Sequence, residues 1–240
     1  MTSSYKVKLL RRHTAAERTM AFYLEKPDGF DFIPGQNIDV GLIDHDIIDP
    51  NDSARAFSIA SAPHHDYLLI MARMRDNQYK NALECLPDGA QLEIYGPYGS
   101  FRLHDDTGIP AVFIIGGIGI TPCYSILSHA IHEKSDRRFY LFYSNRTIAD
   151  AACLDELLRM QTELVNFKCI PTLTAMGQSN NGWKYEYGRI DFAMICRHMP
   201  DPVRAKFYIV GPSRMVWPMV QHLDGRIPRA NMLVEDFTGF

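Results

Sequence analysis

The sequence predicts a protein of two domains, an antiparallel β-barrel followed by an α/β domain with a parallel sheet. At 240 residues, the chain is long enough for two domains of about 100 to 140 residues each. Short strands and turns fill the first part, whereas strands alternate with helices in the second. We therefore expect the domains to span residues 1–104 and 109–240.

Alternating apolar residues and frequent turns predict the barrel. Met20, Phe22 and Leu24 share one face of a candidate strand. Proline and glycine then interrupt the apolar pattern at 27–29, 34–35 and 86–89. Short strands joined by such turns are typical of a small antiparallel barrel.

Buried apolar runs separated by helices predict the second domain. Thr121 and Pro122 have the residue types of a helix start, and Thr147 with Asp150 forms a capping box that predicts another helix just after it. Parallel sheets of this kind bind ligands at the carboxyl ends of their strands. Strands are expected at 111–115, 139–143, 167–173, 207–210 and 232–234, and further helices near 190–199 and 212–223.

Composition and cysteine spacing exclude several functions. With 46% hydrophobic and 22% charged residues, a net charge of −3 and a pI near 6.3, the chain is typical of a soluble globular protein that does not bind nucleic acid. The longest apolar run, 111–120, is about half a membrane span, and the amino terminus lacks a secretion signal. The five cysteines form no CxxC pair, which argues against disulfides, iron–sulfur clusters and zinc. We expect a cytoplasmic protein without a metal or a membrane span.

A glycine-rich turn predicts a phosphate site. Gly116, Gly117 and Gly119 follow a buried strand and precede a helix, where backbone N–H groups and the helix dipole favour an anion. The run matches a GxGxxG fingerprint only loosely, since Pro122 takes the third glycine position. A tight structural turn is the alternative interpretation.

The run Arg55-Ala56-Phe57-Ser58-Ile59-Ala60-Ser61 predicts a different site. Arg55 can pair with a pyrophosphate and Phe57 can stack on a flat heterocycle. Period-two alternation places both on one strand face with Ile59 and Ser61, and Ser58 at the strand edge. A barrel strand with a stray arginine is the alternative.

Six motifs in order along nearly the whole chain resemble the ferredoxin–NADP reductase superfamily. The resemblance implies a Greek-key barrel that binds FAD and a Rossmann-like sheet that binds NADPH or NADH. Its motifs are Pro34-Gly35-Gln36, the Arg55 to Ser61 run, Gly96-Pro97-Tyr98-Gly99-Ser100-Phe101, the Gly116 to Pro122 run, Gly211-Pro212 and Glu235-Asp236-Phe237.

In the flavin half, the resemblance implies that Arg55 binds the FAD pyrophosphate, Phe57 stacks on the isoalloxazine and Ser58 bonds flavin N5. The backbone of the strand Met71, Ala72 and Arg73 would line the flavin.

In the nucleotide half, the resemblance implies that Thr121 lies beside the nicotinamide and that Glu235 places that ring or relays a proton. Phe237 would cover the flavin until nicotinamide displaces it, although Phe240 is an alternative lid. The catalytic set is then Ser58, Thr121, Glu235 and Phe237, and the nucleotide-binding set adds Gly116, Gly117, Gly119, Pro122, Gly211 and Pro212.

Three departures from the family pattern matter. Phe57 replaces a tyrosine, and Val210 replaces the cysteine before Gly211. A glycine and a hydroxyl of the second pyrophosphate segment are replaced within 76–81. There Asn77 would tolerate a left-handed backbone, and Lys80, next to Tyr79, would supply charge.

The end of the second strand of the α/β domain bears on nucleotide choice. No acidic residue stands there to bind a ribose 2′-hydroxyl, while Ser144 and Arg146 can bind a 2′-phosphate. This favours NADPH. Arg146 can instead pair with Asp150, which keeps NADH open.

Together these features predict an FAD-dependent NAD(P)H oxidoreductase. It would transfer hydride from nicotinamide to flavin and pass electrons to a separate acceptor, either a ferredoxin- or flavodoxin-like protein or a small molecule. One alternative is the reductase subunit of an oxygenase or another multi-component complex. The other is a regulatory module that senses nucleotide without turnover. The oligomeric state stays open.

Overall fold

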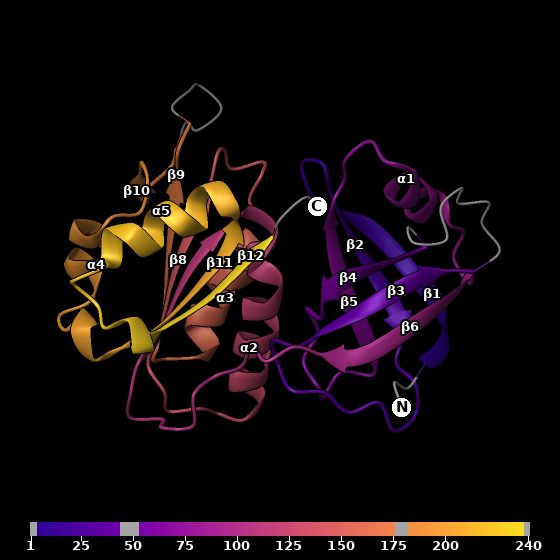
Figure 1. Cartoon of the computed structure of the whole chain (residues 1–240), viewed down its shortest axis with the longest axis horizontal. Helices are drawn as coiled ribbons and strands as arrows, with labels where there is room; N and C mark the ends of the chain where they lie inside the picture. Colours follow the sequence, from indigo (N-terminus) through magenta and orange to yellow (C-terminus); the bar gives the residue numbers. More distant parts are fainter. Residues whose placement is uncertain (1–3, 44–52, 176–181, 238–240) are drawn as a thin grey trace. The chain divides into compact units, whose positions relative to one another are not determined.

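The computed structural model describes residues 4–43, 53–175 and 182–237. By packing, the chain divides into two compact units (Figure 1). One consists of Met1–Arg102 with Thr121–His129, and the other of Leu103–Ile120 with Ala130–Phe240. Assigning FAD to residues 1–104 and nucleotide to 109–240 stays a prediction.

The first unit contains a six-stranded antiparallel sheet, as predicted. Its strand order is β4-β3-β6-β1-β2-β5. Beyond β4, Ala60 N donates to Leu69 O of β5 at 2.7 Å, and Leu69 N donates to Ser61 Oγ at 3.0 Å, so the two edge strands approach each other and the sheet is barrel-like. Its elements are β1 Ser4–Ala16, β2 Thr19–Glu25, β3 Asn37–Leu42, β4 Ala54–Ser58, β5 Tyr67–Arg73, α1 Gln78–Cys85 and β6 Gln91–Tyr98.

Two of the sequence motifs meet inside this unit. Gly35 has φ +103°, and a Cβ atom there would overlap Phe101 O. Gln36 Nε2 also donates to Gly99 O at 3.4 Å. The absence of a side chain at Gly35 and the amide of Gln36 therefore let the Pro34-Gly35-Gln36 turn pack against the Gly96 to Phe101 segment within the barrel.

The second unit is a parallel sheet with helices, again as predicted. Its strand order is β10-β9-β8-β7-β11-β12, and every pairing is parallel. Apolar residues of α4 and α5 pack with β7, β8 and β11 in one core cluster. Its elements are β7 Ala111–Gly116, β8 Phe139–Asn145, α3 Leu154–Glu163, β9 Phe167–Leu173, β10 Glu186–Tyr187, α4 Phe192–His198, β11 Lys206–Pro212, α5 Ser213–Leu223 and β12 Met232–Phe237. The helix that follows β7, α2 Ile120–His132, is shared, since its residues Thr121–His129 group with the first unit.

Three predicted elements form, but with other boundaries than the sequence indicates. The capping box forms, since Thr147 Oγ1 donates to Asp150 Oδ2 at 2.9 Å, but it closes a turn, and α3 starts only at Leu154. The helix predicted at Thr121 starts one residue earlier, directly after a 3₁₀ turn of the glycines. The alternation from Arg55 to Ser61 stops at Ser58, where β4 ends.

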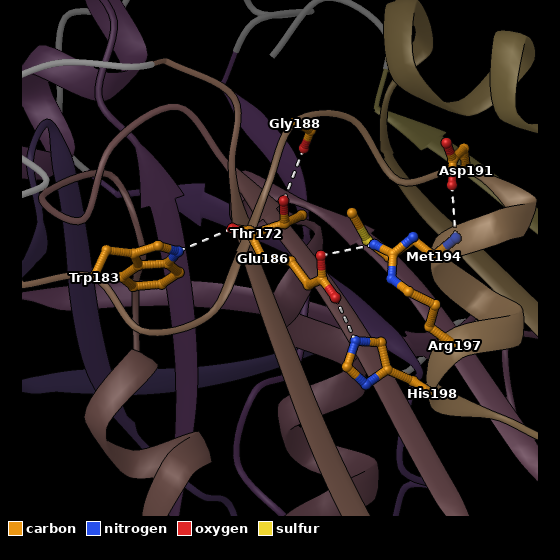
Figure 2. A network of polar contacts seen from close by, with 8 residues as sticks. All are labelled: Thr172, Trp183, Glu186, Gly188, Asp191, Met194, Arg197 and His198. Atoms are coloured by element: carbon orange, nitrogen blue, oxygen red, sulfur yellow. Dashed lines mark hydrogen bonds and ion pairs between the residues drawn. The ribbon is translucent and has the colours of Figure 1, made fainter.

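A polar network holds the β10 edge of the sheet (Figure 2). Glu186 accepts from Arg197 at 2.8 Å and lies 2.6 Å from His198 Nε2. Burial raises the pKa of Glu186, but the hydrogen bonds from His198 and Arg197 outweigh it and hold that pKa below its usual value. Trp183 Nε1 donates to the Glu186 carbonyl at 2.9 Å, and Thr172 Oγ1 to Gly188 O at 2.8 Å. The network ties a two-residue edge strand to α4.

The described residues contain neither a membrane-spanning helix nor a cluster of metal ligands. Among 4–43, 53–175 and 182–237, no helix is long and apolar enough to span a bilayer. Within these same ranges, no group of three His, Cys, Asp or Glu side chains is arranged to hold a metal ion.

Candidate functional site

The Arg55 to Ser58 run lies on β4. The Arg55 guanidinium lies over the Tyr79 ring, with Cζ 5.6 Å from the centroid. Phe57 is 8% exposed, belongs to the barrel core and stacks on Tyr79 with centroids 6.2 Å apart. Ser58 is half-buried. The predicted stack of Phe57 on a flavin ring stays a prediction.

The start of α1 is built by Asn77. This residue is extended, with φ −149°, and its side chain caps the helix by accepting from Lys80 N at 2.9 Å. The left-handed backbone expected of Asn77 is therefore absent. Tyr79 is buried, and its hydroxyl donates to Val40 O at 2.7 Å, so Tyr79 anchors α1 to the barrel.

Positive charge gathers around this helix start. Lys80 is buried, and its ammonium donates to Arg73 O at 2.6 Å. Burial, together with the charges of Arg75 and Arg55, lowers the pKa of Lys80 to about 8. An anion bound here would stabilise the charged form of Lys80 and interact with the helix dipole. Arg75 was not predicted from the sequence, because an arginine in a loop carries no local signal of a site.

The strand after the run, β5, is an edge strand of the barrel sheet. Met71 and Ala72 are 4% and 2% exposed. Arg73 is half-buried, and it donates to Glu17 O at 2.8 Å and Thr19 Oγ1 at 3.3 Å. These contacts fix the end of β5, whose backbone is predicted to line the flavin.

In the second unit, Gly117 has a left-handed backbone next to open space. Its φ is +54°, and nothing lies within 4 Å of a Cβ built on it. Gly119 differs, because a Cβ there would lie 2.8 Å from Val210 O. Gly117 therefore supplies a left-handed, open backbone, and Gly119 supplies close packing of the turn against β11. Thr121 and Pro122 follow in the first turn of α2, and both are buried.

Met215 packs against two more glycines at this edge. A Cβ on Gly116 would lie 2.5 Å from Met215 Sδ, and one on Gly211 would lie 3.1 Å from Met215 Cε. Pro212 forms the N-cap of α5. Met215 was missed in the sequence, because methionine at a helical position reads as an ordinary core residue.

Strand register brings the predicted nucleotide residues together. Gly116 of β7 pairs with Ser144 of β8. Val210 and Gly211 of β11 pair with Glu235 and Asp236 of β12. All six residues lie at the carboxyl ends of parallel strands, where ligands of such sheets bind.

Arg146 and Asp150 bear on the nucleotide prediction. Arg146 follows β8 directly and is exposed. Asp150 Oδ2 accepts from Thr147 N at 3.3 Å and from the Thr147 hydroxyl, so the carboxylate closes its own turn. This geometry is compatible with a role of Arg146 toward a 2′-phosphate.

The end of β12 carries the last predicted residues. Glu235 is partly buried, its Oε2 atom has no hydrogen-bond partner among the described residues, and burial raises its pKa. Asp236 accepts from Ser213 and Trp217 of α5. Phe237 is half-buried, and Phe240 lies outside the described residues. A pairing of Asp236 with α5 was not predicted from the sequence.

Comparison with known proteins gives related sequences. The family described as the oxidoreductase NAD-binding domain matches residues 113–221. The propane 2-monooxygenase reductase component of Mycolicibacterium goodii is 29% identical over 219 residues, which cover 89% of this chain and 61% of that protein. The glycine betaine monooxygenase reductase subunit of Chromohalobacter salexigens is 26% identical over 199 residues, covering 82% of this chain and 53% of that one. The chain thus spans about three fifths or less of these relatives.

Solved structures share the fold. A ferredoxin NADP+ reductase from Neisseria gonorrhoeae, solved with bound FAD and NADP, superposes with a TM-score of 0.78 at 19% identity, over 99% of each chain. A cytochrome P450 reductase from Amycolatopsis gives a TM-score of 0.81 at 21% identity, over 99% of this chain and 71% of the other.

Proposed function

We propose that this chain is an FAD-dependent NAD(P)H oxidoreductase of the ferredoxin–NADP reductase superfamily. The observation that carries the proposal is the gathering of Gly116, Ser144, Gly211 and Glu235 at the carboxyl edge of one parallel sheet. Bound FAD would supply a ring that accepts hydride from the nicotinamide and then releases electrons.

The residues of the barrel fit the pyrophosphate of FAD. Arg55, Arg75 and Lys80 bring positive charge to the start of α1, and Lys80 has a lowered pKa that a bound anion would raise. Arg55 and Lys80 would hold the pyrophosphate, and Ser58 would bond the flavin ring. FMN has one phosphate and no pyrophosphate, so this cluster supports FAD.

The residues of the sheet fit a nicotinamide nucleotide. Gly117 leaves the backbone open to a phosphate, and the short 3₁₀ turn that it begins leads directly into α2. Thr121 and Glu235 would border the nicotinamide, with Glu235 holding or moving a proton. Arg146 would bind the 2′-phosphate, which supports NADPH over NADH.

The electrons would pass to a separate acceptor. The two related reductases described above are components of monooxygenases, which favours an oxygenase component as that acceptor over a small molecule. A ferredoxin- or flavodoxin-like protein is the second candidate. All five cysteines are free thiols, which supports a reducing compartment, the cytoplasm.

One experiment tests the flavin assignment. Purified protein should be yellow and should bleach anaerobically with NADPH. Arg55→Ala should weaken FAD retention about tenfold to a hundredfold, the range for a charge-assisted contact. Arg11→Ala is the matched control, because Arg11 also lies over a tyrosine ring, 3.8 Å from the Tyr23 centroid, but on β1. Equal FAD content in all three proteins would remove Arg55 from the site, and colourless protein that binds nucleotide would favour the regulatory module.

A further inference from the structure

The last strand, β12, presents different residues to its two faces. Val234 packs against the core cluster that contains Val216 of α5. Because successive side chains of a strand alternate, Asp236 falls on the same face as Val234, toward α5, and Glu235 and Phe237 fall on the opposite face.

On its own face, Asp236 is bonded to α5. Its Oδ2 atom accepts from Ser213 Oγ at 3.0 Å and from Trp217 Nε1 at 3.0 Å. The helix α5 begins without a side-chain cap and without an acidic residue in its first turn. The Asp236 carboxylate therefore supplies negative charge to the first turns of α5, where the helix dipole favours it.

This contact lies between Glu235, which the proposed function places beside the nicotinamide, and Phe237, which the sequence predicts to cover the flavin. Asp236 pairs with Gly211, while Glu235 pairs with Val210 and Phe237 with Pro212. In the described sheet β12 is an edge strand, with β11 alone beside it. A tether at Asp236 thus limits the movement of its two neighbours.

We propose that Asp236 is a positioning residue, which through Ser213 and Trp217 holds Glu235 and Phe237 in place for hydride transfer. The inference rests on the proposed function. When nicotinamide displaces Phe237, Asp236 moves with it, and its bond to Trp217 changes. Trp217 is therefore a built-in reporter of nucleotide binding.

Fluorescence tests the movement directly. The chain has two tryptophans, so Trp183→Phe leaves Trp217 as its only tryptophan, which can be excited selectively over the tyrosines. In that background, NADP+ should change the Trp217 emission saturably. Asp236→Ala should abolish the change, whereas Asp236→Asn, which keeps an accepting oxygen, should restore it. An unchanged Trp217 signal in the parent at saturating NADP+ would overturn the inference.

Binding and turnover separate positioning from a merely structural role. Without the hydrogen bonds of Asp236, Phe237 competes less well with nicotinamide. Asp236→Ala should therefore bind NADP+ about threefold to tenfold more tightly, which is the size of effect expected for hydrogen bonds to a partly exposed charge. The variant should also turn over more slowly. Ser213→Ala and Trp217→Phe should each show part of this effect, and they test the idea should Asp236→Ala not fold. Asp224→Ala, at the far end of α5, should match the parent.

Two outcomes distinguish a failure of this inference from a failure of the proposed function. If the parent bleaches with NADPH but Asp236→Ala only lowers the melting temperature, with kcat and KM unchanged, the positioning role is wrong and the proposed function stands. A parent that holds no flavin and binds no nucleotide overturns both.

Discussion

The sulfur of Met215 lies 2.5 Å from the point where a Cβ atom on Gly116 would stand. Gly116 ends β7, and Met215 lies in the first turns of α5, so this contact packs α5 against the strand that leads into the glycine turn. Gly211 shares it, since its Cβ would lie 3.1 Å from Met215 Cε. Glycine at 116 is therefore required by packing as well as by any ligand.

Gly116→Ala should destabilise the protein by about 1 to 3 kcal/mol, the usual cost of overpacking. Met215→Ala in the same chain frees the space, so the double variant should be more stable than the sum of the two single losses predicts. Urea unfolding of the four proteins measures the coupling. Additive losses of stability would show that the backbone moves to make room for the alanine. The contact between Met215 and residue 116 would then not be the reason that glycine is required.

Gly117→Ala should cost about 1 to 2 kcal/mol of stability, because alanine is strained in a left-handed conformation. It should also weaken NADP+ binding, since the methyl group blocks the open backbone. The matched control is Gly225→Ala, where φ is +72° and the space around a Cβ is equally open. Urea unfolding should show similar losses of stability in both variants. Nucleotide titration should show weaker binding in Gly117→Ala alone. Equal nucleotide affinity in both variants would remove Gly117 from the phosphate site.

Sequence patterns predicted the features that depend on local chemistry. Glycines at 116, 117 and 119 after a buried strand define a strand-to-helix turn, and period-two runs define the strands. Parallel register then brings Ser144 to Gly116 without further information. The fold class and the family resemblance are confirmed for this reason.

Contacts between distant segments were not predictable. Nothing near Asp236 in the sequence identifies Ser213 and Trp217 as its donors, and nothing near Gly116 identifies Met215. The pair Thr147 and Asp150 gave a local signal that was ambiguous. The same two hydrogen bonds close a turn as readily as they cap a helix, so the predicted helix start was wrong.

The lowered pKa of Lys80, about 8 against 10.5, predicts two opposite pH effects. Between these values the unfolded chain binds more protons than the native state, so the unfolding free energy of flavin-free protein should rise with pH. FAD affinity should fall over the same interval, because the ammonium is lost. Lys80→Met should remove both trends, and Lys168→Met, an exposed control, should keep them. Denaturant midpoints from pH 7 to 9.5 measure the change in stability, and FAD titrations over the same range measure the change in affinity. If the FAD affinity of the parent does not change with pH, Lys80 is excluded from the pyrophosphate site.

Arg146→Ala should lower kcat/KM for NADPH about tenfold or more and leave NADH nearly unchanged, because NADPH alone carries the 2′-phosphate. Arg138→Ala is the control, since Arg138 immediately precedes the same strand, β8, at its amino end and is also exposed. Steady-state kinetics with both nucleotides decide the matter. A parent that already prefers NADH would show that Arg146 does not select the nucleotide.

Glu235→Gln should stabilise the protein at neutral pH. Burial raises the pKa of Glu235 above 4.5, and its Oε2 atom has no hydrogen-bond partner among the described residues. The native state therefore binds more protons than the unfolded chain above pH 4.5, and the unfolding free energy of the parent falls as pH rises through the native pKa.

Glutamine carries no charge, so the variant should be more stable than the parent at pH 7.5, and the difference should disappear near pH 4.5. Glu163→Gln, exposed in the last turn of α3, should match the parent at both pH values. Urea unfolding at the two pH values provides the test. Turnover should fall in Glu235→Gln alone, because an amide cannot relay a proton. A variant that is stabilised and fully active would mean that the buried carboxylate has no part in proton transfer.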